Sequence, residues 1–130
     1  MLLSKPKLTK LELRVMETFW SKGPSSIREV QEAFPEADRP AYTTVQTIVY
    51  RLEFKKAIRR TGKVTNAHVF EAVVSRDSAM HRMIDDLVAL FGGKSLPIVA
   101  HLIESGKLTS EEVREAQKAL RDLSRKDKSQ

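Results

Sequence analysis

Three short polar patterns along the chain predict where helices begin. In each, a Thr or Ser stands three residues before a Glu, and each of the two side chains can satisfy a backbone amide that the first helical turn leaves unpaired. Gly23-Pro24 is expected to end the first helix and Pro35 the second. The last helix carries one apolar stripe of Val113, Ala116, Leu120 and Leu123. The three capping boxes are Thr9 with Glu12, Ser26 with Glu29, and Thr109 with Glu112.

Between residues 41 and 74 the pattern changes from a helical period to an alternating one. Four apolar residues recur at the spacing of one helix face and predict a third helix over about 41–57. Residues 58–60 and 67–74 then favour the two strands of a β-hairpin, joined by a basic, mobile turn over 61–66. The apolar residues of the third helix are Val45, Ile48, Val49 and Leu52.

After Ser75 the helical period returns. One apolar stripe runs as far as Gly92-Gly93, and a shorter apolar helix is expected over 95–104. We therefore expect a mainly α fold with a small β-hairpin. Its parts are a domain over residues 1–74 and a helical segment over residues 75–130 that ends in a polar tail.

The segment after Ser75 carries more apolar surface than it can cover. About fifty residues are too few to bury three apolar helix stripes internally, and large exposed apolar patches mark contacts with a partner. A second copy of the chain is the simplest cover, so the pattern predicts a homodimer. The residues expected in its interface are Met80, Met83, Ile84, Leu87, Phe91, Leu102 and Leu120.

The net positive charge is concentrated in one segment. From Arg39 to Phe70 there are seven basic residues and one acid, Glu53, so this stretch alone carries the formal charge of +6 of all 130 residues. Such a concentration is typical of a surface that binds a polyanion, because neutralised phosphates release their counterions. A basic face that meets only solvent is the alternative that charge leaves open.

The outer face of the third helix has an unusual composition for a solvated surface. It presents threonines and a tyrosine and no acid before Glu53, although β-branched Thr loses rotamer freedom in a helix. Short hydroxyls and an amide can reach base edges in the major groove of DNA, and Arg51 can hold a phosphate. A helix with a neutral surface and no ligand remains the alternative. The residues expected to contact DNA are Thr43, Thr44, Gln46, Thr47 and Arg51.

Three helices followed by a basic hairpin form the winged helix-turn-helix arrangement, in which the hairpin tip with Lys63 is the wing that lies along the DNA backbone. The chain also resembles the penicillinase and methicillin-resistance repressor family (BlaI/MecI type). The matching residues are Leu8 to Trp20, Tyr42-Thr43-Thr44-Val45-Gln46-Thr47, Arg51-Leu52 and Phe91-Gly92-Gly93.

This resemblance implies a bacterial transcriptional repressor that dimerises through its C-terminal helices and binds palindromic operators, often ahead of a β-lactamase gene. It implies the same reading face on the third helix and a wing at Arg60 and Lys63. It also implies a membrane metallopeptidase sensor that acts indirectly, by leading to cleavage of the repressor. Two positions depart from the best-known members: Gln46 stands where they have Arg, and the region near His101-Leu102 lacks their Asn-Phe cleavage pair.

Residues that imitate catalytic or ligand-binding motifs do not complete one. Without cysteine the chain has no disulfide or thiolate site and does not match the copper-responsive branch of the family. Gly93-Lys94-Ser95 lacks the upstream glycine of a phosphate-binding loop, and the histidines His68, His81 and His101 are too far apart for a metal-ligand spacing. We expect no enzyme activity, cofactor or metal. Because no apolar run suits a signal peptide or a membrane span, we expect a cytoplasmic protein.

One function from another class stays open, namely a winged helix whose basic face binds an acidic protein partner. Such a partner would favour Lys and Arg on the outer face of the third helix. Thr and Gln stand there instead.

Overall fold

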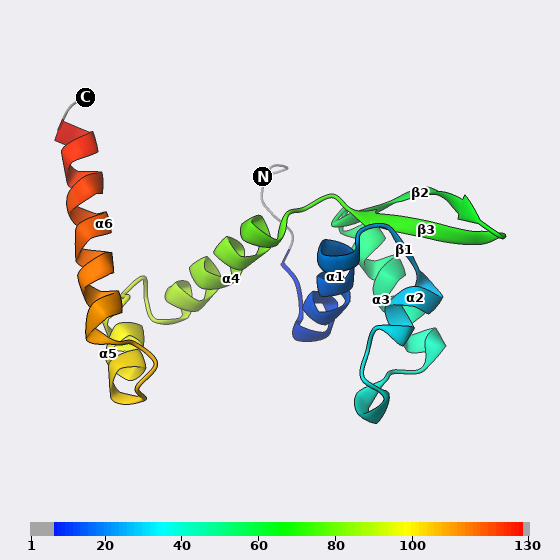
Figure 1. Ribbon diagram of the computed structural model, residues 1–130, viewed down its shortest axis with the longest axis horizontal. Helices are drawn as coiled ribbons and strands as arrows, with labels where there is room; N and C mark the ends of the chain where they lie inside the picture. Colours follow the sequence, from blue (N-terminus) through cyan, green and yellow to red (C-terminus); the bar gives the residue numbers. More distant parts are fainter. Residues whose placement is uncertain (1–6, 129–130) are drawn as a thin grey trace. The chain divides into compact units, whose positions relative to one another are not determined.

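The computed structural model describes residues 7–128, and contacts divide the chain into two compact units after Asp85. The first unit contains α1 (Lys10–Lys22), β1 (Ser25–Ser26), α2 (Ile27–Glu32), a 3-10 helix η1 (Glu36–Asp38), α3 (Tyr42–Phe54), β2 (Ile58–Val64) and β3 (Ala67–Ala72). Helix α4 (Arg76–Leu90) begins in this unit and continues into the second, which also holds α5 (Leu96–Glu104) and α6 (Ser110–Lys128). Figure 1 labels these elements along the chain. The predicted order of three helices, a hairpin and three helices is confirmed.

All three predicted capping boxes form. In α1 the amide of Glu12 donates to the hydroxyl of Thr9, and the amide of Thr9 donates back to the Glu12 carboxylate at 2.8 Å. Ser26 and Glu29 make the same reciprocal pair in front of α2, and Thr109 and Glu112 make it in front of α6. These boxes fix the helix starts because they satisfy amides that have no partner within the helix.

Helix α3 ends earlier than the sequence predicts, at Phe54 rather than near Ala57. Lys56 adopts a left-handed backbone conformation with φ 64°. The amide of Lys56 donates to the carbonyl of Glu53, and the amide of Ala57 donates to the carbonyl of Leu52 at 2.9 Å. This is a Schellman ending with Lys at the position that usually holds Gly. It turns the chain so that Ala57 enters the core.

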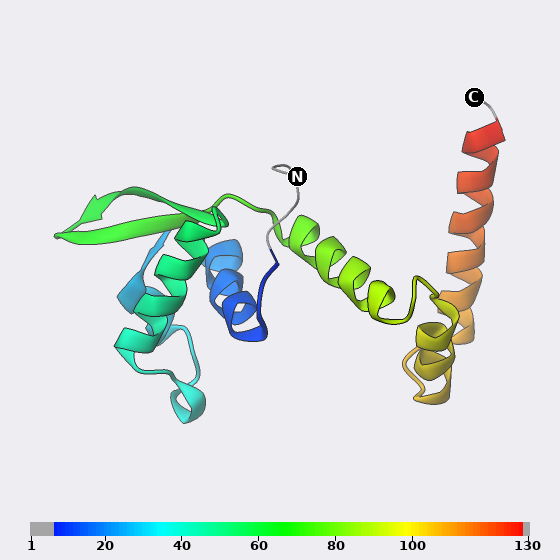
Figure 2. The ribbon, with the colours of Figure 1, turned by 180° about the vertical axis from the view of Figure 1, so that it is seen from behind.

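The sheet has the order β1-β3-β2, with both neighbouring pairs antiparallel. Figure 2 shows the hairpin of β2 and β3 extending past the helices of the same unit. The turn is much tighter than the predicted loop over 61–66. Val64 pairs with Ala67, and only Thr65 and Asn66 lie between them, both with positive φ. Two residues of positive φ match the right-handed twist of a hairpin, so Lys63 lies in a strand and not in a mobile loop.

The core of the first unit lies between the three helices and the sheet. Thirteen apolar residues cluster there. They include the full predicted inner face of α3, and the aromatic Phe70 of β3 is fully buried among them. A side chain that touches a core of this kind on all sides contributes several kcal/mol through burial and close packing. The members are Val15, Met16, Phe19, Ile27, Val30, Phe34, Val45, Ile48, Val49, Leu52, Ala57, Ile58 and Phe70.

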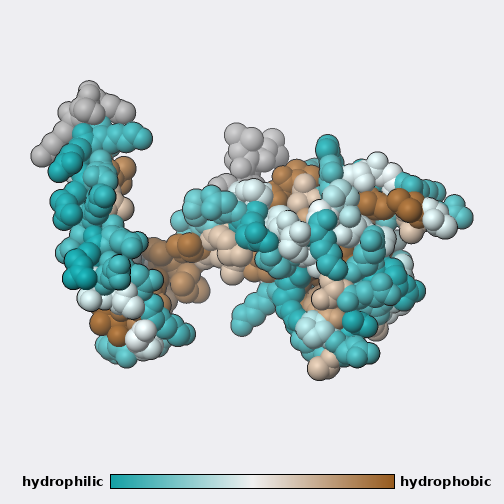
Figure 3. Space-filling view, viewed as in Figure 1, coloured by the Kyte–Doolittle hydropathy of each residue, from teal (hydrophilic) through white to brown (hydrophobic). Residues whose placement is uncertain are grey.

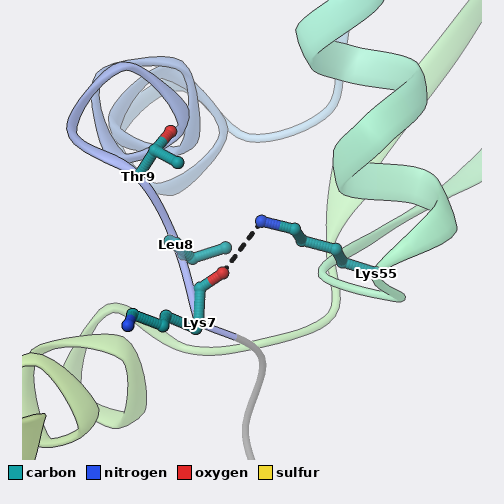
Figure 4. A pocket seen from close by; sticks show the side chains of 4 residues that line it. All are labelled: Lys7, Leu8, Thr9 and Lys55. Carbon is teal, nitrogen blue, oxygen red and sulfur yellow. Dashed lines mark hydrogen bonds between the residues drawn. The ribbon is translucent and has the colours of Figure 1, made fainter.

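A buried ion pair joins the start of α1 to the end of α3. Glu12 is fully buried, and its Oε1 accepts from Lys55 Nζ at 2.7 Å. Lys55 Nζ also donates to the backbone carbonyl of Lys7 at 2.9 Å, as Figure 4 shows. Burial alone would raise the pKa of Glu12, but the hydrogen bonds from Lys55 and Thr9 outweigh it and hold this pKa below its usual value. The carboxylate is therefore charged in the folded state at neutral pH.

The start of α4 belongs to the first unit by its contacts. Ser75 caps the helix by accepting from the amide of Ser78 at 3.0 Å. Trp20 of α1 donates its indole N–H to the carbonyl of Val74 at 2.9 Å, Arg76 pairs with Glu17, and Ala79 is buried. The contact division after Asp85 thus lies within α4, beyond the boundary that the sequence predicts at Ser75. That boundary between folding domains stays a prediction.

The second unit consists of helices that end where the sequence predicts. Helix α4 ends before Gly92 and Gly93, and α5 ends before Gly106; all three glycines have positive φ. None of the residues described from 86 onward is buried. The contrast with the first unit is clear, since these helices carry their apolar side chains at the surface.

Candidate nucleic-acid interface

Helix α3 divides into a buried face and an exposed face. Val45, Ile48, Val49 and Leu52 are all buried in the core, which fixes how the helix is rotated about its axis. Thr43, Thr44, Thr47 and Arg51 are consequently exposed, and Gln46 is partly exposed. All five side chains that the sequence predicts as DNA contacts therefore lie on the accessible side of α3.

Two of these side chains are already tied to α3 itself. Thr47 Oγ1 donates to the backbone carbonyl of Thr43 at 3.0 Å, which leaves its methyl group and its lone pairs outward. Gln46 Nε2 donates to the hydroxyl of Tyr50 at 3.3 Å. Helix α3 has no side-chain cap at Ala41 and no acid in its first turn. Its N-terminal amides and their positive dipole end are thus available to a negatively charged ligand.

A groove connects α3 to the hairpin. Residues of β1, α2, α3 and β3 line it together with the turn residue Asn66, so α3 and the hairpin border one surface. Lys63 pairs in register with His68, which lines this groove. Directly paired residues of antiparallel strands point to the same face, so Lys63 lies on the groove side of the hairpin. The lining residues are Ser26, Ile27, Arg28, Tyr42, Gln46, Tyr50, Asn66, Ala67, His68 and Phe70.

Four of the seven basic residues between Arg39 and Phe70 are engaged within the protein. Most of their partners are acids and carbonyl oxygens outside this segment, so the formal charge of the segment does not show which of its cations are free. The contacts are Arg39 with the carbonyls of Phe34 and Glu32, Lys55 with Glu12, Arg59 with Glu71 at 2.6 Å, and Arg60 with Glu53 at 2.8 Å.

Arg60 is the predicted site residue that this pairing affects. Its guanidinium makes two hydrogen bonds to Glu53 and lies 5.4 Å from the centre of the Phe70 ring. The hydrogen bond to Glu53 raises the pKa of Arg60. A guanidinium held by a carboxylate is poorly placed to neutralise a phosphate, so its predicted role as a wing contact is weakened.

The side chains of three basic residues of the segment, Arg51, Lys56 and Lys63, are exposed, and within residues 7–128 these side chains make no hydrogen bond or ion pair. Lys56 lies beyond the C-terminal end of α3, whereas Arg51 and Lys63 lie on the reading helix and the wing. Sequence reasoning missed Arg28. This exposed residue of α2 lines the groove, with its guanidinium 4.7 Å from the centre of the Tyr42 ring. The sequence offered one signal for Arg28, namely its position in the first turn of α2, just after the Ser26 cap.

The residues predicted at the dimer interface are all at least partly exposed. On α4, Met80, Met83, Ile84 and Leu87 keep between 37% and 56% of their surface exposed, and Phe91 just after it keeps 44%. Figure 3 shows apolar side chains gathered along α4. On the other two helices, Leu102 is partly exposed and Leu120 is 65% exposed.

Residues 7–128 contain neither a candidate metal-binding cluster nor a membrane-spanning helix. That part of the chain brings together no group of three His, Asp or Glu side chains able to hold a metal ion. It also contains no helix long and apolar enough to cross a membrane.

Comparison with solved structures defines the fold class. The solution structure of the DNA-binding domain of the repressor BlaI aligns with 58% of this chain and 90% of that domain, at 23% identity and a TM-score of 0.50. A variant of MarR from E. coli aligns with 89% of this chain and 77% of its own, at 15% identity and a TM-score of 0.50. The protein is thus a winged-helix protein, as its helices and hairpin predict.

Comparison of sequences defines the family. The transcriptional regulator BlaI of Mycobacterium tuberculosis is 29% identical over 120 residues, which are 90% of this chain and 85% of that protein. A penicillinase repressor of Staphylococcus aureus is 23% identical over 121 residues, 92% of this chain and 95% of its own length. The sequence model of the penicillinase repressor family matches residues 8–122, so the chain belongs to this family of transcriptional repressors. The prediction of a repressor and not an enzyme is confirmed.

Proposed function

We propose that this repressor binds a palindromic DNA operator as a homodimer, with α3 in the major groove and the hairpin along the backbone. The observation that carries the proposal is the exposed face of α3. It presents hydroxyls, an amide and Arg51, all on the side opposite the buried stripe. These groups match the donors and acceptors of base edges and phosphates. The groove that joins α3 to the wing gives the duplex one continuous surface.

The proposed roles follow from where each group lies. Thr43, Thr44, Gln46 and Thr47 contact bases or the adjoining backbone, because they occupy the exposed side of α3. Arg51, Lys63 and Arg28 neutralise phosphates, because no acid among residues 7–128 pairs with them. Arg60 acts mainly within the protein, through Glu53.

The dimer follows from the apolar stripes of α4, α5 and α6. They carry seven predicted interface residues that one chain leaves accessible. A two-fold interface would present two copies of α3 to half-sites about one DNA turn or a multiple of it apart, each turn being about 34 Å. Palindromic symmetry in the operator would then mirror the symmetry of the protein.

A salt titration of duplex binding tests the proposal. With three proposed phosphate contacts per protomer, a dimer would neutralise about six phosphates, and affinity should fall on the order of a thousandfold between about 50 and 200 mM salt. Fluorescence anisotropy measures this affinity at each salt concentration for two duplexes, the DNA upstream of the gene and a random duplex of equal length. Binding that is insensitive to salt, or equal on the two duplexes, would contradict the proposal. An acidic protein partner would then be the better interpretation of the basic face.

A further inference from the structure

Tyr50 lies on the exposed side of α3 beside Gln46 and has no assigned role so far. Gln46 and Tyr50 stand four residues apart, the spacing at which helical side chains meet, and Gln46 Nε2 donates to the Tyr50 hydroxyl at 3.3 Å. Both residues line the groove between α3 and the hairpin. A glutamine side chain has three rotatable bonds and loses much freedom when it is fixed. Tyr50 restricts that freedom before any ligand arrives.

Tyr50 is itself held in place from the core. The Arg60 guanidinium lies 5.8 Å from the centre of its ring and 5.4 Å from that of Phe70, which is fully buried. Glu53 holds the same guanidinium through hydrogen bonds of 2.8 and 3.3 Å. A cation over an aromatic ring is attracted to its face. A chain of contacts therefore runs from the core, through Arg60 and Tyr50, to the amide of Gln46.

This contact uses one of the two hydrogens of the Gln46 amide. One Nε2 hydrogen is donated to Tyr50, so the second Nε2 hydrogen and Oε1 remain for a ligand. In the major groove adenine offers an acceptor at N7 beside a donor at N6, which matches one donor and one acceptor of an amide. Guanine offers two acceptors, N7 and O6, and would leave Oε1 without a donor.

We propose that Tyr50 orients Gln46 to read an adenine, which makes Tyr50 a specificity-determining positioning residue. The inference rests on the proposed function, since it requires α3 to lie in the major groove. Tyr50 needs no contact with DNA for this role. It acts by fixing the amide, and Arg60 and Glu53 act by fixing Tyr50.

Selection of binding sites from a randomised duplex library tests the inference with the full chain and its variants. The wild type should enrich a motif with adenine at one position of each half-site. Gln46→Ala should lose that preference, by about five- to a hundredfold in relative affinity for adenine over the other bases. Tyr50→Phe keeps the ring and removes only the hydroxyl. It should lower the preference at that position by about two- to tenfold, as expected for one hydrogen bond, and leave the other positions unchanged.

Tyr42→Phe is the matched control, because it removes the hydroxyl of the other tyrosine of α3 and keeps the ring beside Arg28. It should leave the adenine preference intact. In the double variant Gln46→Ala with Tyr50→Phe, the preference should equal that of Gln46→Ala alone, because Tyr50 acts only through Gln46. Circular dichroism of each variant checks that the winged helix is folded.

The outcomes separate this inference from the proposed function. If the wild type enriches a motif but no adenine preference in it is lost in Gln46→Ala, the inference is overturned and DNA recognition stands. A Tyr50→Phe variant with an unchanged motif, or one that loses affinity equally at all positions, has the same consequence. A wild type that enriches no motif overturns both.

Discussion

The two units of this protein use apolar side chains in opposite ways. In the first, thirteen apolar residues from three helices, two strands and their connections form one buried cluster. In the second, α5 and α6 are as regular as α1 and α3, but none of the described residues from 86 onward is buried. The first unit carries its own core, whereas the second needs a further surface to cover its apolar stripes. The comparison supports the proposal that DNA reading resides in the first unit and assembly in the helices from α4 onward.

Removal of the chain beyond Ala79, which takes away most of α4 together with α5 and α6, should have the largest effect. A chain that ends at Ala79 keeps the Trp20 hydrogen bond to Val74 and the pair of Arg76 with Glu17. It should fold, yet its operator affinity should fall by about 10²- to 10⁴-fold, because two half-site contacts are no longer linked. Anisotropy on a full operator and on one half-site measures the loss. Equal affinity of the short and full chains for the full operator would show that assembly contributes nothing.

One substitution in each unit sharpens the same comparison. Phe70→Ala should lower the free energy of unfolding by about 3–5 kcal/mol, because it opens a cavity in the core. Leu87→Glu places a charge on the apolar stripe of α4, where Leu87 is 43% exposed in the single chain. It should weaken dimerisation by about 2–4 kcal/mol and leave the unfolding of the first unit nearly unchanged. Thermal unfolding and sedimentation velocity read the two effects separately. The comparison fails if Leu87→Glu unfolds the first unit or leaves the dimer intact.

Within the first unit, reading helix and wing should also respond differently. Thr47→Ala should cost about 1–3 kcal/mol on the operator and little on random DNA, because it removes a base-facing group. Lys63→Ala should weaken binding to both duplexes alike and reduce the salt slope by about two for a dimer. Salt titrations on the two duplexes give both quantities. Equal losses for the two variants on both DNAs would mean that the reading face is wrongly assigned.

The smallest expected effect concerns the buried pair of Glu12 and Lys55. Because the folded-state pKa of Glu12 is lowered from the ordinary value of 4.5, its contribution to stability is complete above that value. It is lost as pH falls through the folded pKa. Glu12→Gln should flatten this part of the curve of unfolding free energy against pH. Urea unfolding at a series of acidic pH values measures it, with Glu17→Gln as an exposed control. Wild-type and Glu12→Gln curves of the same shape would contradict this role of the pair.

Much of the fold could be predicted from local patterns. The capping pairs at Thr9, Ser26 and Thr109 and the glycine endings at Gly92 and Gly106 depend on neighbouring residues only. The α3 ending and the hairpin turn were misplaced, because Lys56, Thr65 and Asn66 adopt positive φ without being glycine. Asn is enriched at positive φ, but Lys and Thr are not, so residue type marks Asn66 and neither Lys56 nor Thr65.

The sequence predicted which side chains of α3 are exposed, but it did not predict which basic residues near the site are paired with acids. The buried stripe of α3 fixes its opposite side, so Thr43, Gln46 and Thr47 were placed correctly on the accessible face. Which cations are free depends on pairs such as Lys55 with Glu12, which stand far apart in the chain. Arg28 was not assigned as a site residue for the same reason, because only the folded groove brings it beside Gln46. Tyr50 was placed on the outer face of α3 from the helical spacing, but it was given no role.

Sedimentation equilibrium of the full chain, beside the chain that ends at Ala79, tests the division of roles between the two units most directly. At micromolar concentration the full chain should sediment as a dimer and the shortened chain as a folded monomer. Addition of a palindromic operator should give one duplex bound to two full-length protomers. A full chain that remains monomeric, or a shortened chain that still dimerises, would contradict the assignment of assembly to the C-terminal helices.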